Sequence, residues 1–309
     1  MSVKLCMEPK TPPLTWEEFC KQSGPFSIAL DGYVKESPKV DYLGPRANFN
    51  HHEGVSRLEM RATCGQVLMV IRQGLFDCFR DKDGVRADVY VNDCDEDVCT
   101  AWFLLNNSDL VINSTNRFLN RLVSMEDALD TTAGAYPFPK DLPVLRELAW
   151  VFEPYRRIRL NGELERKNTM LFLNVVLEVE ERIHAHITGK GFEIPVDMRY
   201  ERIGGGNGWT MIHEIGAQGR TGAFADGIRA YVSVRQLPSG RYAYTVGRMS
   251  QFIQFDVLKI LQRLGDYEDQ THERWGGGDT IGGSPRVAGT KHTPKDVERI
   301  VNEVVNRLG

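Results

Sequence analysis

The sequence predicts an α/β fold, with an open, mostly parallel sheet that carries helices on both faces and a smaller α+β domain after it. Segments 25–33, 47–54 and 85–93 have the lengths, apolar content and bounding turn residues of strands. Helical patterns follow two of these segments, and strands that alternate with helices favour a parallel sheet. After residue 187 the pattern changes to glycine-rich stretches and a hairpin, which indicates a second architecture.

The length of the chain indicates more than one domain. A chain of 309 residues is longer than one ordinary core requires, and its 41% hydrophobic and 26% charged residues are typical of a globular protein. We expect a first domain at 1–145, a helical connector at 146–187 and a second, smaller domain at 188–309.

Three segments of the first domain are predicted to be strands. PFSIALDGY (25–33) is an apolar run that ends at Asp31-Gly32, and ANFNHHEG (47–54) is a shorter strand that ends at the histidines. VRADVYVND (85–93) alternates apolar and polar residues and ends at Asp93.

Two helices are predicted between and after these strands. Near-helical spacing of apolar residues from Leu58 predicts a helix that Gly74 ends. DVCTAWFLLNN (97–107) predicts another helix, with Asp97 as its N-cap.

The second half is predicted to contain helices, a hairpin and a closing helix. Segment 141–187 is mostly helical in pattern, and RAYVSVRQLPSGRYAYTVGR (229–248) predicts a hairpin that turns at 238–240. Thr293 and Pro294 mark the start of the last helix. Its apolar residues form one stripe, which we interpret as packing: Val297, Ile300, Val301, Val304, Val305 and Leu308.

Charge and cysteine usage limit the classes of function. The net charge of -4 and the sequence pI of about 6.0 argue against a protein that coats long DNA, so a nucleic-acid substrate would be short or monomeric. The six scattered cysteines indicate reduced thiols. No apolar run approaches the ~18 residues of a membrane span, and no secretory signal is visible. We therefore expect a cytoplasmic protein without a membrane partner.

Metal-ligand residues follow all three predicted strands. They are Asp31, then Asn50-His51-His52, and then Asp93 to Asp97. In open parallel sheets, ligands bind outside the carboxyl ends of the strands, so these side chains are expected to converge. Carboxylates with imidazole suit Mn²⁺, and carboxylate-rich sites also suit Mg²⁺. The sequence therefore favours a site for metal or phosphate.

Two simpler interpretations of these residues stay open. The acidic cluster could be a solvated turn that caps the following helix, and the histidine pair could be structural. A calcium-binding EF-hand is excluded, because Val98 and Leu104 stand where that loop requires Gly and Glu.

Four motifs of the first domain resemble those of the DHH phosphoesterase superfamily. They are LDGY (30–33), FNHHEG (49–54), DCDEDVCTAWFLL (93–105) and SMEDALDTTAGAYPF (124–138). The resemblance implies one or two Mn²⁺ or Mg²⁺ ions held by Asp31, His51, Asp93, Asp95 and either Asp127 or Asp130. It also implies catalytic roles for His51, His52, Asp93 and Asp95.

The second half is similar to the substrate-binding domain associated with this superfamily. There, an arginine-bearing strand and a glycine-rich loop hold the distal phosphate or base of the substrate, and the matching segments here are TVGRMS (245–250) and RWGGGDTIGGSPR (274–286). A plain flexible turn is the alternative for the second segment. The substrate-binding residues that the resemblance implies are Arg248, Gly276, Gly277, Gly278, Ser284 and Arg286.

The resemblance implies a hydrolase of phosphodiester or phosphomonoester bonds in a short oligonucleotide or small nucleotide, by metal-activated water. A homodimer is the candidate assembly. The chain departs from the family pattern in the order of its acidic motif, in Asn50 for the usual aspartate, and in Val89 or Val91 for the usual histidine. Asp279 also replaces a histidine of the glycine-rich loop. These departures support the alternative, a non-catalytic nucleotide-binding or regulatory protein on a similar fold.

Overall fold

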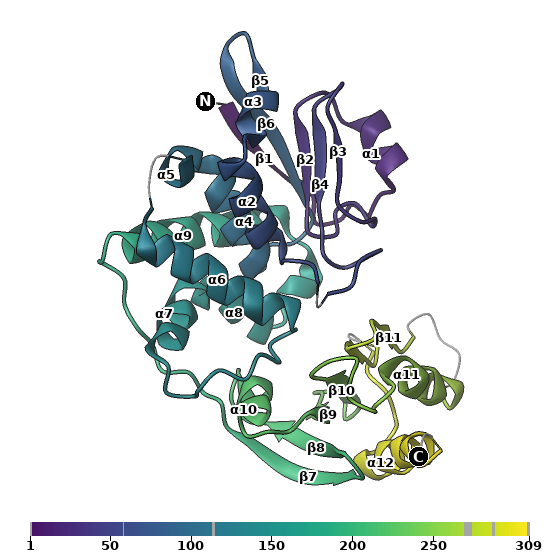
Figure 1. Cartoon of the computed structure of the whole chain (residues 1–309). Helices are drawn as coiled ribbons and strands as arrows, with labels where there is room; N and C mark the ends of the chain where they lie inside the picture. The colour runs from purple at the N-terminus through teal and green to yellow at the C-terminus, as the bar shows by residue number, and fades with distance from the viewer. Residues whose placement is uncertain (1, 58, 113–114, 269–273, 286–287, 308–309) are drawn as a thin grey trace. The chain divides into compact units, whose positions relative to one another are not determined.

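The computed structural model describes residues 2–57, 59–112, 115–268, 274–285 and 288–307 (Figure 1). The chain forms two compact units. The first comprises residues 1–131 and 143–195, and the second comprises residues 132–142 and 196–309. The chain therefore enters the second unit twice.

The first unit is built on a mostly parallel sheet, which confirms the predicted α/β class. Its order is β1 (Ser2–Met7), β6 (Gly84–Val91), β2 (Ser27–Leu30), β4 (Arg46–Phe49) and β3 (Lys39–Asp41). The pairs β1·β6, β6·β2 and β2·β4 are parallel, whereas β3 is an antiparallel edge strand. The short β5 (Arg80–Asp81) pairs with the start of β6 in an antiparallel hairpin.

Helices pack against both faces of the sheet, so its central strand is buried. All four residues of β2 are buried. On one face, Phe19 of α1 (Trp16–Gln22) packs against Tyr33 and Tyr90. Figure 1 shows α2 (Thr63–Arg72) and α4 (Glu96–Asn106) against the other face. The carboxyl ends of β2 and β4 therefore lie beside the first turn of α2.

Short and long helices complete the first unit. The short ones are α3 (Leu75–Cys78), α5 (Ser108–Ile112) and the 3-10 helix η1 (Leu164–Arg166), and the longer ones are α6 (Arg117–Thr131), α7 (Pro143–Val151), α8 (Glu153–Leu160) and α9 (Thr169–Ile187). Segment 146–187, which we expected to form a connector, is not separate, because α9 packs against α4, α6 and β1. Glu180 of α9 accepts hydrogen bonds from Trp102 Nε1 (2.9 Å) and Asn106 Nδ2 (2.7 Å) of α4.

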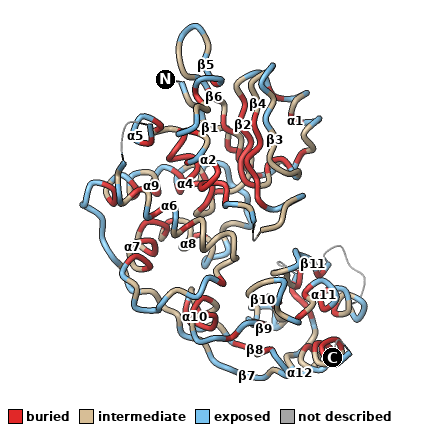
Figure 2. Tube along the Cα trace, viewed as in Figure 1, coloured by how far each residue is buried: buried red, intermediate tan, exposed pale blue. Residues whose placement is uncertain are grey.

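The second unit is a mixed sheet covered by helices. Its order is β11 (Gly276–Gly277), β12 (Ile281–Gly283), β10 (Tyr242–Arg248), β9 (Ala230–Gln236), β8 (Trp209–Glu214) and β7 (Tyr200–Gly206). The predicted hairpin is the antiparallel pair β9·β10. Figure 2 shows buried residues along α11 (Val257–Asp266) and α12 (Pro294–Val305), which pack on this sheet with the predicted apolar stripe of α12. Leu308 lies outside the described residues.

The second unit also includes α10 (Gly219–Ala225) and the separate segment 132–142. Ala135 of this segment is buried in a small apolar cluster with Ile212, Phe224 and Tyr231. Lys140 forms an ion pair of 2.5 Å with Asp226. Segment 132–142 therefore contributes both to the core and to the surface of this unit.

Two details of the sequence prediction were wrong. The helix expected from residue 58 begins at Thr63, and residue 58 itself lies outside the described residues. The N-cap of α4 is Asp95 rather than Asp97, because the Asp95 side chain accepts the backbone N–H of Val98. Among the described residues, we find no helix with the length and apolarity that crossing a bilayer requires.

Candidate metal centre

Asp31 occupies a tight turn immediately after β2. Its φ of 45° lies in the left-handed region, which aspartate tolerates better than most residues, and Gly32 follows with φ of 78°. The backbone N–H of Asp31 donates to the carbonyl of Phe49 at 2.9 Å, so the turn is joined to the end of β4. Asp31 is 7% exposed, and its carboxylate points into the interior of the first unit.

Asn50 shapes the loop that carries the two histidines. Its amide group donates to the carbonyl of Glu36 at 2.9 Å and to the carboxylate of Glu53 at 2.8 Å. Its Oδ1 accepts the backbone N–H of His52 at 3.0 Å. An amide can donate and accept at the same time, and aspartate could not make the two donated bonds. Asn50 therefore has a structural role in which an aspartate could not replace it.

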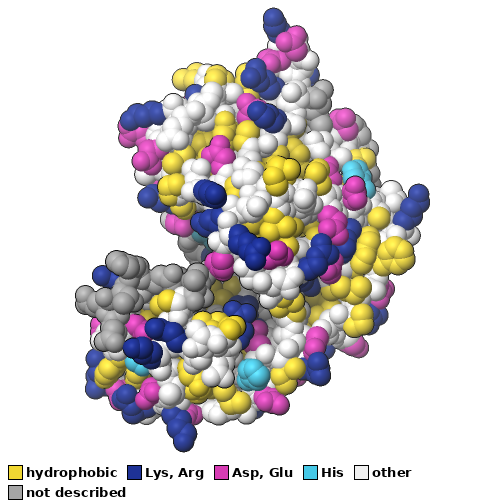
Figure 3. Space-filling model, turned by 180° about the vertical axis from the view of Figure 1, so that it is seen from behind, with side chains coloured by type: hydrophobic (Ala, Val, Ile, Leu, Met, Phe, Trp, Pro, Cys, Tyr) yellow, Lys and Arg dark blue, Asp and Glu magenta, His cyan; other side chains and the backbone are white. Residues whose placement is uncertain are grey.

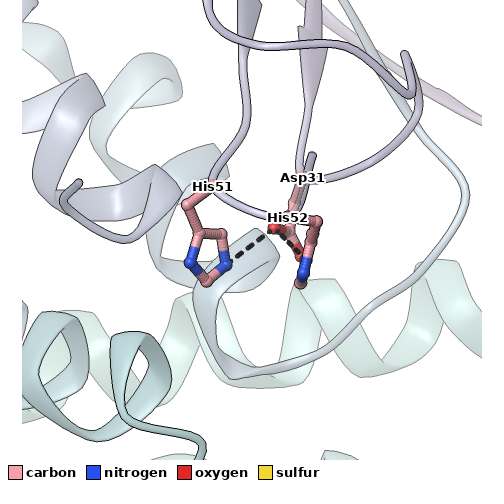
Figure 4. Close-up of side chains that lie close together, drawn as sticks. All are labelled: Asp31, His51 and His52. Atoms are coloured by element: carbon pink, nitrogen blue, oxygen red, sulfur yellow. Dashed lines mark ion pairs between the residues drawn. The ribbon is translucent and has the colours of Figure 1, made fainter. Parts of the chain in front are cut away.

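The side chains of Asp31, His51 and His52 converge beyond the strand ends (Figure 4). Asp31 Oδ1 lies 3.3 Å from His51 Nε2 and 2.9 Å from His52 Nε2. His51 Nε2 also lies 2.7 Å from Asp130 Oδ2 and 3.9 Å from Asp97 Oδ2. The sequence separations are large, so the fold alone brings these groups together. Among the described residues, two sets of donor atoms are close enough to hold a metal. One set is Asp31, His51 and His52, and the other is His51, Asp97 and Asp130.

Several buried atoms of this cluster lack a hydrogen-bond partner among the residues that the structure describes. They are both ring nitrogens of His51 and Oδ2 of Asp130. The short contact between His51 Nε2 and Asp130 Oδ2 therefore joins two polar atoms without hydrogen-bond geometry. Buried polar atoms are rarely left unpaired, because removing them from water costs free energy. The donor set of one or two imidazoles and three carboxylates fits a divalent cation, which would satisfy these atoms.

Asp97 belongs to the cluster, although the sequence interpretation favoured it as the cap of the following helix over a role as ligand. Its Oδ2 accepts the backbone N–H of Thr63 and its Oδ1 that of Cys64, both at 2.7 Å. These N–H groups belong to the first turn of α2, where they have no partner within the helix. Asp97 is 1% exposed. The start of α2 therefore orients the carboxylate towards His51.

Asp127 and Asp130 were alternative ligands, and the structure separates their positions. Asp127 Oδ1 accepts the backbone N–H of Ala62 at 2.6 Å, and its Oδ2 accepts from Arg61 at 3.1 Å. Asp130 follows it on α6 and lies against His51. Asp130 is therefore the residue of this pair that the cluster contains, and Asp127 caps the start of α2.

Asp93 and Asp95 lie beside the cluster. Asp95 caps α4, and Asp93 Oδ1 accepts the backbone N–H of Cys94 at 2.7 Å. Neither residue is in the two donor sets that the described residues form. Burial raises the pKa of Asp95, and the negative charges of Asp31 and Asp93 raise it further. A raised pKa favours the neutral form of this carboxyl group.

Burial and mutual charge shift the pKa values within the cluster. At Asp31, burial raises the pKa, but the two imidazoles outweigh burial and hold it well below its usual range. At His51, burial lowers the pKa, but Asp130 and Asp31 outweigh burial and raise it to about 10. Burial, Asp130 and Asp31 together raise the pKa of Asp97 to about 7. The carboxylates thus draw a positive charge to His51, which is the charge that a bound cation would supply.

The residues that we expected to bind substrate in the second unit hold its strands and loops together. Arg248 Nε donates to the carbonyl of Asp279 at 2.8 Å, and Ser284 Oγ accepts the backbone N–H of Tyr244 at 2.9 Å. Gly276 and Gly277 form β11, and the N–H of Gly278 donates to the carbonyl of Ile281. Arg286 lies outside the described residues. The glycine-rich segment is therefore a small hairpin with a paired backbone.

Two basic residues near the cluster were not found by sequence reasoning. Arg57 Nη2 lies 2.7 Å from His52 Nδ1, and Arg61 binds Asp127. The only available signal was the presence of two arginines between the histidine pair and a predicted helix, which is common in surface loops. No protein-family model matches this chain, and no curated protein matches it either.

Proposed function

We propose that this chain is a metal-dependent phosphoesterase of the DHH type that hydrolyses a short oligonucleotide or a small nucleotide. The observation that carries the proposal is the surroundings of His51. Its Nε2 faces the carboxylates of Asp31, Asp97 and Asp130, at distances between 2.7 and 3.9 Å. A single imidazole cannot donate one proton to three carboxylates, whereas a cation beside it can bind all four groups.

Mn²⁺ or Mg²⁺ is the cofactor that this donor set favours. His51, Asp97 and Asp130 would hold one ion, and Asp31 with His52 would complete that site or take part in a second one. When bound, a divalent ion polarises phosphoryl oxygens and lowers the pKa of water, which is the chemistry that phosphoester hydrolysis needs. Asp97 is held by two backbone N–H groups, so its carboxylate has a fixed position in the site.

The surface supports a small substrate. On the face drawn in Figure 3, the described Lys and Arg side chains are interspersed with Asp and Glu side chains. A protein that binds long nucleic acid needs a continuous basic surface, because phosphate contacts dominate the affinity. The six cysteines are free thiols, which supports a reducing, cytoplasmic location.

The proposal is tested by metal content and turnover. The purified chain is loaded with Mn²⁺, its bound metal is quantified, and release of nucleotide from short oligomers and cyclic dinucleotides is measured. Asp31→Asn and His51→Ala are compared with Glu181→Gln, an exposed change on α9. We expect both cluster variants to lose metal and at least about 100-fold in activity, and Glu181→Gln to retain both. Nucleotide binding that is independent of Mn²⁺, without turnover of any probe, would instead support the non-catalytic alternative.

A further inference from the structure

The loop between His52 and α2 carries two arginines that end at the edge of the metal centre. Arg57 Nη2 lies 2.7 Å from Nδ1 of His52, whose Nε2 lies 2.9 Å from Asp31. Arg61 Nη1 donates to Asp127 Oδ2 at 3.1 Å. The two arginines are four positions apart in the sequence, so one short loop places both guanidinium groups on the rim of the cluster.

The charge of Arg57 has no carboxylate partner in the described part of the chain. Arginine keeps its proton at any physiological pH, so the Arg57 guanidinium donates and His52 Nδ1 accepts. Within residues 2–57 and the other described ranges, no Asp or Glu oxygen lies within ion-pair distance of Arg57. The imidazole of His52 supplies no negative charge, so the positive charge of Arg57 is uncompensated and an anion is its natural complement.

Arg61 can leave its present partner at little cost. Asp127 also accepts the backbone N–H of Ala62 at 2.6 Å, so its carboxylate stays hydrogen-bonded without the arginine. The Arg61 side chain is 58% exposed, and exposed ion pairs contribute little to stability. Its guanidinium is therefore available to a ligand that approaches the cluster.

We propose that Arg57 and Arg61 bind a terminal phosphate of the substrate and select a phosphomonoester dianion over an internal diester. The inference rests on the proposed function, because it names the substrate class of the same site. A guanidinium group binds two phosphate oxygens at once. A monoester carries nearly two negative charges at pH 7 to 8 and a diester carries one, so two arginines complement the monoester. The substrates are then nucleotides or short oligonucleotides with a terminal phosphate.

The test compares two small probes that differ by one methyl group. The full chain with Mn²⁺ is titrated calorimetrically with adenosine 5′-monophosphate and with its 5′-phosphate methyl ester. We expect the monophosphate to bind about tenfold tighter, and Arg57→Gln and Arg61→Gln each to remove most of this preference. Arg146→Gln is the matched control, because Arg146 makes an exposed ion pair with Glu193 away from the cluster. Equal binding of both probes by the wild-type protein would overturn the proposal, and so would an unchanged preference in both arginine variants.

A second measurement separates anion binding from positioning of His52. The Mn²⁺ affinity of each variant is measured without nucleotide, and Arg57→Lys is added because it keeps the charge and loses the planar fork. We expect unchanged Mn²⁺ affinity in all variants, and partial recovery of the monophosphate preference in Arg57→Lys. A parallel loss of Mn²⁺ and monophosphate affinity in Arg57→Gln would show that Arg57 acts only through His52. Preference without hydrolysis of any probe would refute the phosphoesterase and leave the anion site standing, and hydrolysis without preference would do the reverse.

Discussion

Asp97 on α4 accepts the backbone N–H of Thr63, the first residue of α2, at 2.7 Å, although 34 residues separate them in the sequence. The same carboxylate accepts the N–H of Cys64 and lies 3.9 Å from His51 Nε2. One buried side chain therefore links the start of a helix to the candidate metal centre.

Asp97→Asn is expected to weaken both functions of this residue. An amide has a single acceptor oxygen, and its NH₂ group would face a backbone N–H, which leaves a buried donor unsatisfied. We expect a loss of about 1–3 kcal/mol in the free energy of unfolding, and a loss of about 10- to 100-fold in Mn²⁺ affinity. Urea denaturation without metal and metal titration under native conditions measure the two effects. Unchanged Mn²⁺ affinity would exclude Asp97 from the site.

Asp95→Asn is the matched comparison two residues earlier. Asparagine caps helices as well as aspartate does, so the bond to the Val98 N–H is expected to persist. The stability should change by less than about 0.5 kcal/mol, and Mn²⁺ affinity should stay within about threefold of the wild-type value. The same two assays apply. If Asp95→Asn loses metal as Asp97→Asn does, Asp95 is a ligand and the structural assignment is wrong.

Glu180→Ala is expected to weaken the packing of α9 against α4. The carboxylate accepts from Trp102, Asn106 and Asn107 at 2.7 to 3.0 Å, so the variant leaves three donors without their partner. We expect a loss of about 2–4 kcal/mol in the free energy of unfolding, measured by urea denaturation. Glu181→Ala, on the exposed side of the same helix, is expected to change it by less than about 0.5 kcal/mol. Similar losses in both variants would argue against the role of Glu180.

Gly277→Ala is expected to destabilise the hairpin of the second unit. Gly277 has φ of 152°, and a Cβ there would lie 2.2 Å from the Cα of Gly282 across the hairpin. We expect a loss of about 1–3 kcal/mol, seen as a lower midpoint of thermal unfolding. Gly276→Ala is the control, because a Cβ at that position meets no atom within 4 Å. Equal melting temperatures for the two variants would contradict the backbone argument.

The sequence predicted the elements whose pattern is local. The buried run before Asp31 and the alternating run before Asp93 became β2 and β6, and the capped stripe from Thr293 became α12. The strand β1 escaped prediction although Val3, Leu5 and Met7 alternate with Ser2 and Lys4, and its pairing with β6 joins residues more than 80 positions apart. Pairing between distant segments is a property of the fold and has no signature in a short window.

The candidate site shows the same division. Placing Asp31 and His51 at strand ends required only local patterns, and the structure places both in the cluster. The choice between Asp95 and Asp97 required the position of α2, because a shift of two residues turns a helical side chain by about 200°. The N–H groups of Thr63 and Cys64, which have no partner within α2 and donate to Asp97, decide which carboxylate faces inward. Their positions relative to α4 are set by tertiary packing.

The second unit is formed by two separate segments of the chain, 132–142 and 196–309, and this limits where the protein can be cut into folded fragments. A fragment that begins at Val196 lacks segment 132–142, so it loses Ala135 from its apolar cluster and the Lys140 partner of Asp226. A fragment that ends at Pro195 keeps segment 132–142 without the surface on which it packs. A single proteolytic cut between the units therefore yields no intact half, and each half depends on chain continuity with the other.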